Sequence, residues 1–172
     1  MKIIIIAAIA KNGVIGKDGG IPWKIDEDFK RFKRLTTGHP CIMGKGTYES
    51  LPDVARPLPG RENIILTSDK AYNPPGAKVF HSFEGALEHC RKERAAKVFV
   101  IGGATVYKSC MKVADTLELT MIEKDYPGDT FFPEIDFDEW ELVGKAYNEG
   151  KDAKNGETVR FSFLTYNRKK RL

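Results

Sequence analysis

The chain has 172 residues, of which 41% are hydrophobic and 30% are charged, a composition typical of one globular domain and a length too short for two well-packed ones. Its net charge of +4 falls well short of the basic excess of nucleic-acid-binding proteins and favours small anionic ligands instead. We therefore expect a single domain over residues 1–172, ending in a solvated basic tail at 168–172.

The first ten residues, MKIIIIAAIA, have the apolar run and small-residue ending of a secretion signal. However, Lys2 alone precedes the run, and Asn12-Gly13 interrupts the chain long before the roughly 20 apolar residues that a membrane helix needs. We interpret residues 3–9 as a buried central strand and expect no membrane segment.

Cysteine and histidine positions limit the possible redox and metal chemistry. The three cysteines, Cys41, Cys90 and Cys110, have no C-x-x-C spacing, which is typical of reduced, packed cysteines in a cytoplasmic protein. The three histidines, at positions 39, 81 and 89, lack the spacing that would place two on one helix face or hairpin. We therefore predict no metal site.

Apolar runs and turn residues divide the chain into alternating strands and helices. In chain order, we predict strands at 3–9, 39–43, 63–66, 78–80, 97–101 and 116–123, and helices at 25–36, 45–51, 82–92 and 104–112, with Ser82 as a helix N-cap. Segments 11–23, 52–61 and 125–140 are expected to be loops, and 140–148 should pair with 158–166 as a hairpin. This order predicts an α/β fold with a single-domain central mixed, mostly parallel sheet, helices on both faces and a C-terminal antiparallel hairpin.

The helix predicted at 25–36 has an acid on its apolar face. Ile25, Phe29, Phe32, Leu35 and Thr36 share that face, and Asp28 projects along it, whereas the remaining charged residues, Arg31 among them, lie off it. No lysine or arginine shares this stripe within one turn, so a buried Asp28 needs another partner. The simpler alternative is that residues 26–28 are acids that favour the positive end of the helix dipole.

Three predicted strands end in turns suited to phosphate. These are Gly44 with Lys45, Gly46 and Thr47; Thr67 with Ser68; and Gly102-Gly103 with Ala104 and Thr105. Glycine lets backbone N–H groups approach an oxyanion, and the following helix adds partial positive charge. Any one of these turns is equally consistent with a simple strand ending, but three together favour an extended, multiply phosphorylated ligand. The G-x-G-x-x-G fingerprint of a standard Rossmann nicotinamide site is absent.

The ordered motifs VIGKDGGIPW, PCIMGKGTYESL, RPLPGRENIIL, VFVIGGATVY and GDTFFP, with Asp28 and Phe32 between the first two, resemble bacterial dihydrofolate reductases of the chromosomal type nearly end to end. A few residues near 52–55 are additional. The resemblance implies NADPH-dependent reduction of 7,8-dihydrofolate to tetrahydrofolate, by hydride transfer to C6 and protonation of N5. It also implies binding of antifolate inhibitors.

The resemblance assigns catalytic roles to Asp28, Thr120 and Trp23. Asp28 would accept two hydrogen bonds from the pterin, Thr120 would link the acid to the pterin amino group, and Trp23 would hold a water near the acid. Arg61 would bind the glutamate α-carboxylate of the substrate, with Arg56 as a second candidate. The implied substrate site comprises Ile6, Ala8, Asp28, Phe29, Phe32, Leu51, Arg56, Leu58, Arg61, Ile101 and Thr120.

The resemblance also implies an NADPH site, with an unusual cis bond between Gly102 and Gly103 and with Lys45 and Ser68 at the 2′-phosphate. Many family members have arginine where this chain has Lys45, and another side chain at Gly46. The loop at 12–21 would close over the nicotinamide, braced by Asp129. The implied cofactor residues are Ala8, Ile15, Gly16, Gly20, Gly44, Lys45, Gly46, Thr47, Thr67, Ser68, Ile101, Gly102, Gly103, Ala104, Thr105, Val106 and Tyr107.

Two other functions are consistent with parts of the sequence. A related reductase acting on a pyrimidine precursor of flavin synthesis would share the cofactor turns, but gives no reason to keep Asp28, Thr120 and Arg61 together. A catalytically silent module would bind nucleic acid through the basic tail, with steep salt dependence. We expect a small-molecule enzyme without nucleic-acid or membrane partners, and a monomer, because no exposed heptad or large apolar segment is present.

Overall fold

The computed structural model describes residues 1–170, which contain ten strands, four α-helices and two 3₁₀ turns joined by loops. The strands are β1 (Lys2–Ala10), β2 (Val14–Gly16), β3 (Cys41–Gly44), β4 (Asn63–Leu66), β5 (Ala77–Phe80), β6 (Lys97–Val100), β7 (Thr116–Ile122), β8 (Thr130–Phe131), β9 (Trp140–Lys151) and β10 (Thr158–Arg168). The helical elements are α1 (Asp26–Thr36), α2 (Lys45–Ser50), α3 (Phe83–Lys92), α4 (Ala104–Cys110), η1 (Asp53–Ala55) and η2 (Phe137–Glu139).

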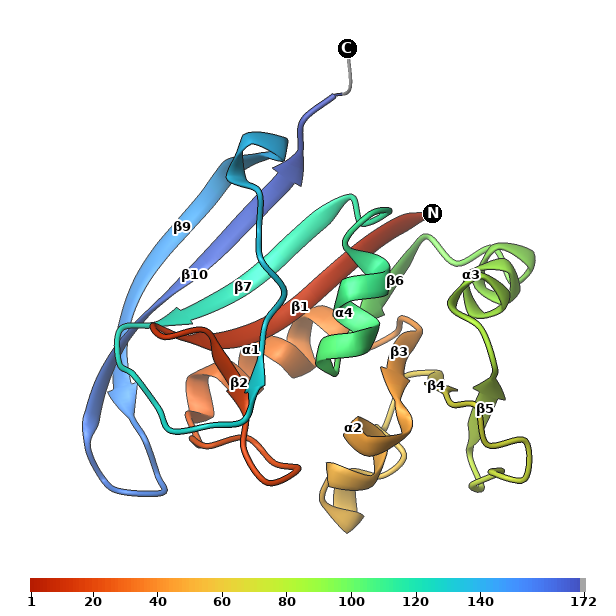
Figure 1. Cartoon of the computed structure of the whole chain (residues 1–172), viewed down its shortest axis with the longest axis horizontal. Coiled ribbons are helices and arrows are strands. Elements are labelled where there is room, and N and C mark those ends of the chain that lie inside the picture. Colours follow the sequence, from red (N-terminus) through yellow and green to blue (C-terminus); the bar gives the residue numbers. More distant parts are fainter. Residues whose placement is uncertain (171–172) are drawn as a thin grey trace.

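Eight strands form one mixed sheet in the order β5-β4-β3-β6-β1-β7-β10-β9, which crosses Figure 1 from β5 at one edge to β9 at the other. All neighbours from β5 to β7 pair in parallel, and β10 runs antiparallel to both β7 and β9. This confirms the predicted single-domain, mostly parallel sheet with a terminal antiparallel hairpin.

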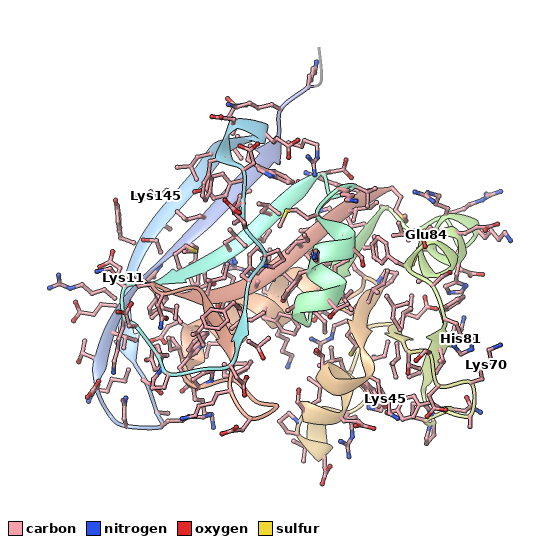
Figure 2. The ribbon with its side chains drawn as sticks, in the orientation of Figure 1. Lys11, Lys45, Lys70, His81, Glu84 and Lys145 are labelled. Carbon is pink, nitrogen blue, oxygen red and sulfur yellow. The ribbon has the colours of Figure 1, made fainter. Side chains whose placement is uncertain are left out.

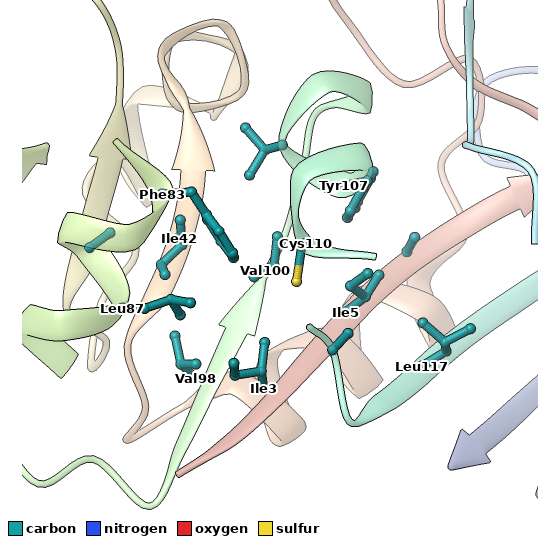
Figure 3. Close-up of a cluster of buried hydrophobic side chains, with 14 of the residues drawn as sticks. Ile3, Ile5, Ile42, Phe83, Leu87, Val98, Val100, Tyr107, Cys110 and Leu117 are labelled. Atoms are coloured by element: carbon teal, nitrogen blue, oxygen red, sulfur yellow. The ribbon is translucent and has the colours of Figure 1, made fainter. Parts of the chain in front are cut away.

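Strand β1 is the centre of the sheet and is covered on both faces. Ile3 and Ile5 pack in a core with residues of α3 and α4, as Figure 3 shows, whereas Ile4 and Ile6 pack in a second core with residues of α1 and α2. Successive side chains of a strand point to opposite faces, so an unbroken isoleucine run is what a doubly covered strand requires. The predicted buried strand at 3–9 is confirmed, and the three cysteines are free and buried.

Most predicted elements lie within a few residues of those observed. Helix α3 begins after Ser82, whose hydroxyl accepts the Gly85 N–H at 3.0 Å, so the predicted N-cap is confirmed. The terminal hairpin is longer than predicted, because β9 and β10 stay paired from Trp140 opposite Arg168 to Lys151 opposite Thr158.

The predicted loops contain some regular structure. Strand β2, within the glycine-rich loop, pairs antiparallel with β8, within the segment predicted as loop 125–140. The proline-rich segment 52–61 includes the single turn η1 and a cis bond between Arg56 and Pro57. The loop predictions were wrong at these places because β2 and β8 are too short to show periodicity, and each pairs only with the other.

Helix α1 confirms the helix predicted at 25–36, but its orientation differs from the apolar pattern. Arg31, predicted to lie off the buried face, is only 8% exposed, whereas Phe29, predicted on that face, is 45% exposed. The helix turns Asp28 and Arg31 toward the sheet, and Phe29, about 100° from Asp28 around the axis, is left uncovered.

The basic tail is not wholly a solvated terminus. Arg168 is the last residue of β10, and its guanidinium donates to the Ala114 and Met111 carbonyls and lies 4.3 Å from the Trp140 ring centroid. Because these contacts fix the side chain, the prediction of a solvated tail is wrong for Arg168. The tail residues Arg171 and Leu172 lie outside the described part of the chain. No helix within residues 1–170 is long and apolar enough to cross a membrane.

A fully buried acid, Asp152, joins the tip of the terminal hairpin to the loop before α1. Its carboxylate accepts the Lys24 and Lys154 backbone N–H groups, both at 3.0 Å, and the Tyr126 hydroxyl at 2.8 Å. Burial raises the pKa of this carboxyl, but the hydrogen bonds outweigh burial and hold the pKa below its usual range. Asp152 is therefore charged and satisfied at neutral pH.

We predict that Asp152→Ala lowers the free energy of unfolding at pH 7 by about 2–4 kcal/mol, because buried donors lose a charged acceptor. A lowered pKa adds stability above the pKa of the unfolded chain, and this contribution disappears as pH falls through the folded-state pKa. The difference in free energy of unfolding between the parental protein and the variant should therefore shrink below about pH 4. Urea unfolding of both proteins over a range of pH values measures this difference.

The exposed Asp125 is the matched control for this experiment. Asp125→Ala should change the free energy of unfolding by less than about 0.5 kcal/mol at every pH. Equal losses in the two variants would contradict a specific role for the Asp152 carboxylate.

Candidate active site

The predicted acid makes a direct contact between α1 and β7. The Thr120 hydroxyl, on β7, donates to Asp28 Oδ1, on α1, at 2.6 Å. Asp28 is half-buried and Thr120 is buried. Burial raises the pKa of the Asp28 carboxyl, and Thr120 and the Arg31 guanidinium lower it only in part, so the pKa lies above its usual range. The partner that a buried Asp28 requires is thus present on the neighbouring strand.

Trp23 is buried at the end of the loop that precedes α1. Its ring lies 5.0 Å from the ring of Tyr126, in a cluster with Ala10, Ile25 and Phe161. The packing fixes Trp23 two residues before Ile25, whose carbonyl accepts the Asp28 N–H. Trp23 and Asp28 therefore belong to one rigid connection between the loop and α1.

The apolar substrate candidates gather largely on one face of the sheet. Five of the seven share the core between the sheet and helices α1 and α2, namely Ile6, Phe32, Leu51, Leu58 and Ile101. Ala8 instead packs at the margin of the Trp23 cluster, and Phe29 is exposed on α1. The structure thus brings most of these residues together beside Asp28, which Phe32 follows by one helical turn.

The two candidate arginines are held differently. Arg61 donates to the Pro59 carbonyl at 2.8 Å and to the Thr36 hydroxyl at 3.2 Å, which places its guanidinium at the C-terminal end of α1. Arg56 donates to Asp53, at 2.8 Å, and to the Glu49 carbonyl. Arg61 keeps unused donors of its planar fork, whereas a carboxylate already neutralises Arg56.

The three phosphate-binding candidates adjoin one another. The Gly44 N–H donates to the Gly102 carbonyl at 2.8 Å, and a Cβ on Gly102 or Gly103 would come within 3.5 Å of the Thr47 hydroxyl. The Lys45 ammonium lies 3.3 Å from the Asp69 carboxylate, in the turn that begins at Thr67. The ends of β3, β4 and β6 therefore form one continuous edge lined by glycine and hydroxyl groups.

The Gly102-Gly103 turn has an unusual backbone. Its peptide bond is cis, as the resemblance implied, and Gly102 has a φ of 123°, which side chains rarely tolerate. A Cβ on Gly44 would lie 3.5 Å from the Val106 side chain, and the Tyr107 hydroxyl donates to the Ile6 carbonyl of β1 at 2.8 Å. The beginning of α4 therefore lies close to the end of β3 and is hydrogen-bonded to the backbone of β1.

Basic and acidic side chains meet at the Thr67 turn. The Lys45 ammonium lies 4.6 Å from the Tyr72 ring, and His81 Nδ1 lies 2.7 Å from the Thr67 carbonyl. Figure 2 shows Lys45, Lys70 and His81 on the side of the molecule that α2 and β5 form, opposite Lys145. The sequence analysis missed Asp69, whose carboxylate forms an ion pair with the Lys45 ammonium and partly neutralises its charge.

The glycine-rich loop is fixed by residues that come about a hundred positions later. Asp129 accepts the Asp18 N–H at 3.0 Å and donates its own N–H to the Gly16 carbonyl, so the bracing contact expected of Asp129 is present. Ile15, Gly16 and Gly20 lie in this loop, and Ile15 packs against the α3 and α4 core. Within residues 1–170, no group of three or more His, Cys, Asp or Glu side chains is arranged to hold a metal ion.

Comparison with known proteins decides which family these features represent. The sequence pattern of dihydrofolate reductase matches residues 2–168. The chain belongs to the dihydrofolate reductase family. This membership identifies an NADP-dependent oxidoreductase and confirms the predicted enzyme class.

Relatives in this family match the chain over nearly its whole length. Dihydrofolate reductase HdrB of Haloferax volcanii is 41% identical over 98% of this chain and 84% of its own, and the enzyme of Staphylococcus aureus is 38% identical over 99% and 100%. The solved dihydrofolate reductase from Enterococcus faecalis, complexed with NADP(H) and RAB-propyl, has a TM-score of 0.85 at 36% identity, covering 98% of this chain and 97% of that one. The dihydrofolate reductase fold is therefore confirmed.

Sequence reasoning missed several residues that shape this dihydrofolate reductase site. Asn12 exchanges hydrogen bonds with the backbone of Tyr126, and Asp152 fixes Lys24. Arg31 pairs with Glu118, and the latter had a detectable signal: it lies two residues before Thr120, on the same face of β7. A strand face that presents Thr120 to α1 must present Glu118 to it as well.

We predict that Gly128→Ala disrupts the glycine-rich loop that contains β2. A Cβ at Gly128 would lie 2.3 Å from Val14 and 2.6 Å from the Gly16 carbonyl, so β2 must move. Overpacking of this kind lowers the free energy of unfolding by about 1–3 kcal/mol. Thermal or urea unfolding measures the change.

Gly20→Ala, in the same loop, is the control, because the nearest atom to its Cβ would be 3.8 Å away. It should change the free energy of unfolding by less than about 0.5 kcal/mol. A Gly128 variant as stable as the Gly20 variant would refute the steric argument.

Proposed function

We propose that the chain reduces 7,8-dihydrofolate to 5,6,7,8-tetrahydrofolate with NADPH, by hydride transfer to C6 and protonation of N5, and so supplies one-carbon metabolism. The observation that carries the proposal is the contact of Asp28 with Thr120 at 2.6 Å, beside the apolar cluster that contains Phe32. Family membership and the relatives' names supply the reaction class.

Asp28 is the residue that binds and polarises the pterin. Its half-buried carboxylate accepts parallel hydrogen bonds from the 2-amino group and the neighbouring ring N–H, a charge-assisted arrangement that offsets its desolvation. Thr120 donates to Oδ1 and holds the acid in place. Because each carboxylate oxygen can accept two hydrogen bonds, Oδ1 and Oδ2 can still each accept one from the pterin. The negative charge favours the N5-protonated pterin, and a water that Trp23 positions carries the proton.

The remaining substrate contacts follow from the apolar cluster and from Arg61. Ile6, Phe32, Leu51, Leu58 and Ile101 enclose the pterin and aminobenzoyl rings, and Phe29 and Ala8 complete this lining at its two ends. Arg61 binds the glutamate α-carboxylate with the unused edge of its guanidinium, which its bonds to Pro59 and Thr36 orient. Arg56, already paired with Asp53, makes at most an outer contact.

The turns at the ends of β3, β4 and β6 fit an NADPH molecule. When bound, NADPH supplies the hydride. Gly102, Gly103 and the first turn of α4 present backbone N–H groups to the pyrophosphate, and a side chain at Gly102 would fill this space. Gly44, Gly46 and Thr47 extend the same surface to α2, and a Cβ at Gly46 would meet no atom within 4 Å. Lys45 and Ser68 hold the 2′-phosphate.

Loop 12–21, braced by Asp129, covers the nicotinamide and excludes water from the reacting carbon. Antifolate inhibitors occupy the pterin position against Asp28. The protein acts as a cytoplasmic monomer.

We predict that adding dihydrofolate to purified protein oxidises NADPH faster than NADH, and that an antifolate blocks the reaction. Lys45→Gln should lower the NADPH-to-NADH ratio of kcat/KM about tenfold, because a charge-assisted contact of about 1.5–3 kcal/mol is lost. The loss of NADPH or NADH absorbance at a fixed dihydrofolate concentration measures the antifolate-sensitive reaction and the preference for NADPH over NADH.

Lys70→Gln, an exposed neighbour with the same change of charge, is the control and should keep the parental ratio. An unchanged ratio in the Lys45 variant would remove Lys45 from phosphate recognition. Absence of NADPH oxidation in the parental protein would refute the proposed reaction.

We also predict that Asp28→Asn folds normally but loses about 10²-fold or more of kcat/KM at neutral pH. Part of the activity should return at acid pH, because the substrate then arrives already protonated. Steady-state kinetics from pH 5 to 8 test this expectation.

Asp26→Asn is the matched control, since Asp26 lies on the exposed side of the same first turn. If both acids serve only the helix dipole, the two variants should behave alike. Parental activity in Asp28→Asn across the pH range would remove Asp28 from the mechanism.

A further inference from the structure

A second polar pair joins α1 to β7, one turn further along the helix. The Arg31 guanidinium, on α1, lies 2.6 Å from Glu118 Oε2, on β7, and 4.6 Å from the ring centroid of Phe163, on β10. Arg31 and Glu118 are largely removed from water, with side chains 9% and 16% exposed. A buried ion pair of this kind contributes little net stability but is strongly perturbed when one partner is removed.

The strands around the pair support Glu118 as well as Arg31. The Thr165 hydroxyl, on β10, donates to Glu118 Oε2 at 2.7 Å, so the carboxylate accepts from two side chains at one oxygen. Phe163 covers the face of the Arg31 guanidinium. The guanidinium therefore has a fixed position in the interior rather than the range of positions open to a surface arginine.

The spacing relates this pair to the site acid. Arg31 follows Asp28 by three residues on α1, a rise of about 4.5 Å, and Glu118 precedes Thr120 by two residues on β7, about 6.6 Å. The contacts Asp28 with Thr120 and Arg31 with Glu118, both 2.6 Å, are thus two adjacent connections between the same helix and strand. Because both contacts join the same helix to the same strand, a shift of α1 at Arg31 also moves Asp28 relative to Thr120.

We propose that Arg31 and Glu118 act as a positioning pair, which fixes the place of the Asp28 carboxylate against β7 and balances its charge in the interior. The pair would set the pH range over which Asp28 is ionised and able to hold a pterin. The kinetic and binding consequences rest on the proposed function, whereas the effect on Asp28 itself does not.

The charged and titratable groups near Asp28 make this role specific. Arg31, on its own helix, is the cation that lowers the pKa of Asp28, which burial raises. Thr120 on β7 is a neutral donor, and Tyr107 on α4 is neutral because burial, followed by the Asp28 charge, raises its pKa far above its usual value. Glu118, two residues before Thr120 on β7, carries the same charge as Asp28, and the Arg31 guanidinium 2.6 Å away compensates it.

The test follows the Asp28 carboxyl directly, by ¹³C NMR titration of the aspartate side chains in the protein without substrate, with Asp28→Asn identifying the signal. Arg31→Met removes the cation and leaves Glu118 uncompensated, so the Asp28 midpoint should move to higher pH. Glu118→Gln removes the opposing anion and leaves the cation, so the midpoint should move to lower pH.

These opposite directions separate positioning from a merely structural role. Loss of packing alone would destabilise both variants and move both midpoints the same way or not at all, and either result would overturn the proposal. Arg31→Lys retains the charge without the planar fork, so it should return the midpoint most of the way to the parental value. A lysine variant that behaves like the methionine variant would also overturn it.

Binding provides a second measurement. The pH dependence of the Kd for dihydrofolate should move with the NMR midpoint in each variant, while the Kd for NADPH should stay within about twofold of the parental value because Lys45 and Gly102 are unchanged.

Should the parental protein fail to reduce dihydrofolate, the proposed function would be refuted, whereas opposite NMR shifts would still support the positioning pair. If either single variant does not fold, Arg31→Lys and the double variant Arg31→Met with Glu118→Gln, which should titrate near the parental midpoint, replace it.

Discussion

A carboxylate that is partly removed from water needs hydrogen-bond donors nearby. The position of Asp28 therefore constrains how α1 packs on the sheet. Its permanent donor, the Thr120 hydroxyl, belongs to a strand 92 residues later, so α1 has to lie across β7 for the contact at 2.6 Å to form. The same placement buries Arg31 and brings it against Glu118. Because Thr120 uses only one of the acceptor sites on the two carboxylate oxygens, the acid is fully satisfied only when a ligand with two N–H groups binds beside it.

The parallel sheet positions the second half of the site. Strands β3, β4 and β6 end at the same edge, and each is followed by a turn with glycine or hydroxyl groups, so the three candidate phosphate-binding turns form a continuous surface. The hydrogen bond from Gly44 to Gly102 fixes two of them together, and the Lys45 contact with Asp69 fixes the third. The Tyr107 hydroxyl then connects this edge to the Ile6 carbonyl of β1.

Local patterns predicted the features that depend on local physics. The isoleucine run of β1, the Ser82 cap and the helix at 25–36 each follow from patterns within a few residues, and these predictions are confirmed. The buried face predicted for that helix is wrong at Phe29 and Arg31. The errors fall where the partner is distant. The sequence predicts Arg31 as a surface cation, because its partner Glu118 lies on β7. It predicts β2 as a loop, because β2 is a strand only through its pairing with β8. It gives no signal for Asp152, whose partners Tyr126 and Lys24 are distant in the chain. The roles of the individual site residues remain predictions.

The contacts of Asp152 and Asp129 bear on when the site can form as the chain is made. The loop at 12–24 is among the first segments synthesised, yet its contacts come from Tyr126, Asp129 and Asp152, and Lys24 is 128 residues from its acceptor. Phe163 and Thr165, which surround the pair beside Asp28, arrive later still. The segments that form the edge at the ends of β3, β4 and β6 are thus synthesised by residue 107, before the residues that contact Asp28 and the glycine-rich loop. The contacts of the candidate acid and of the glycine-rich loop can form only after most of the chain has been made, and the terminal hairpin completes them.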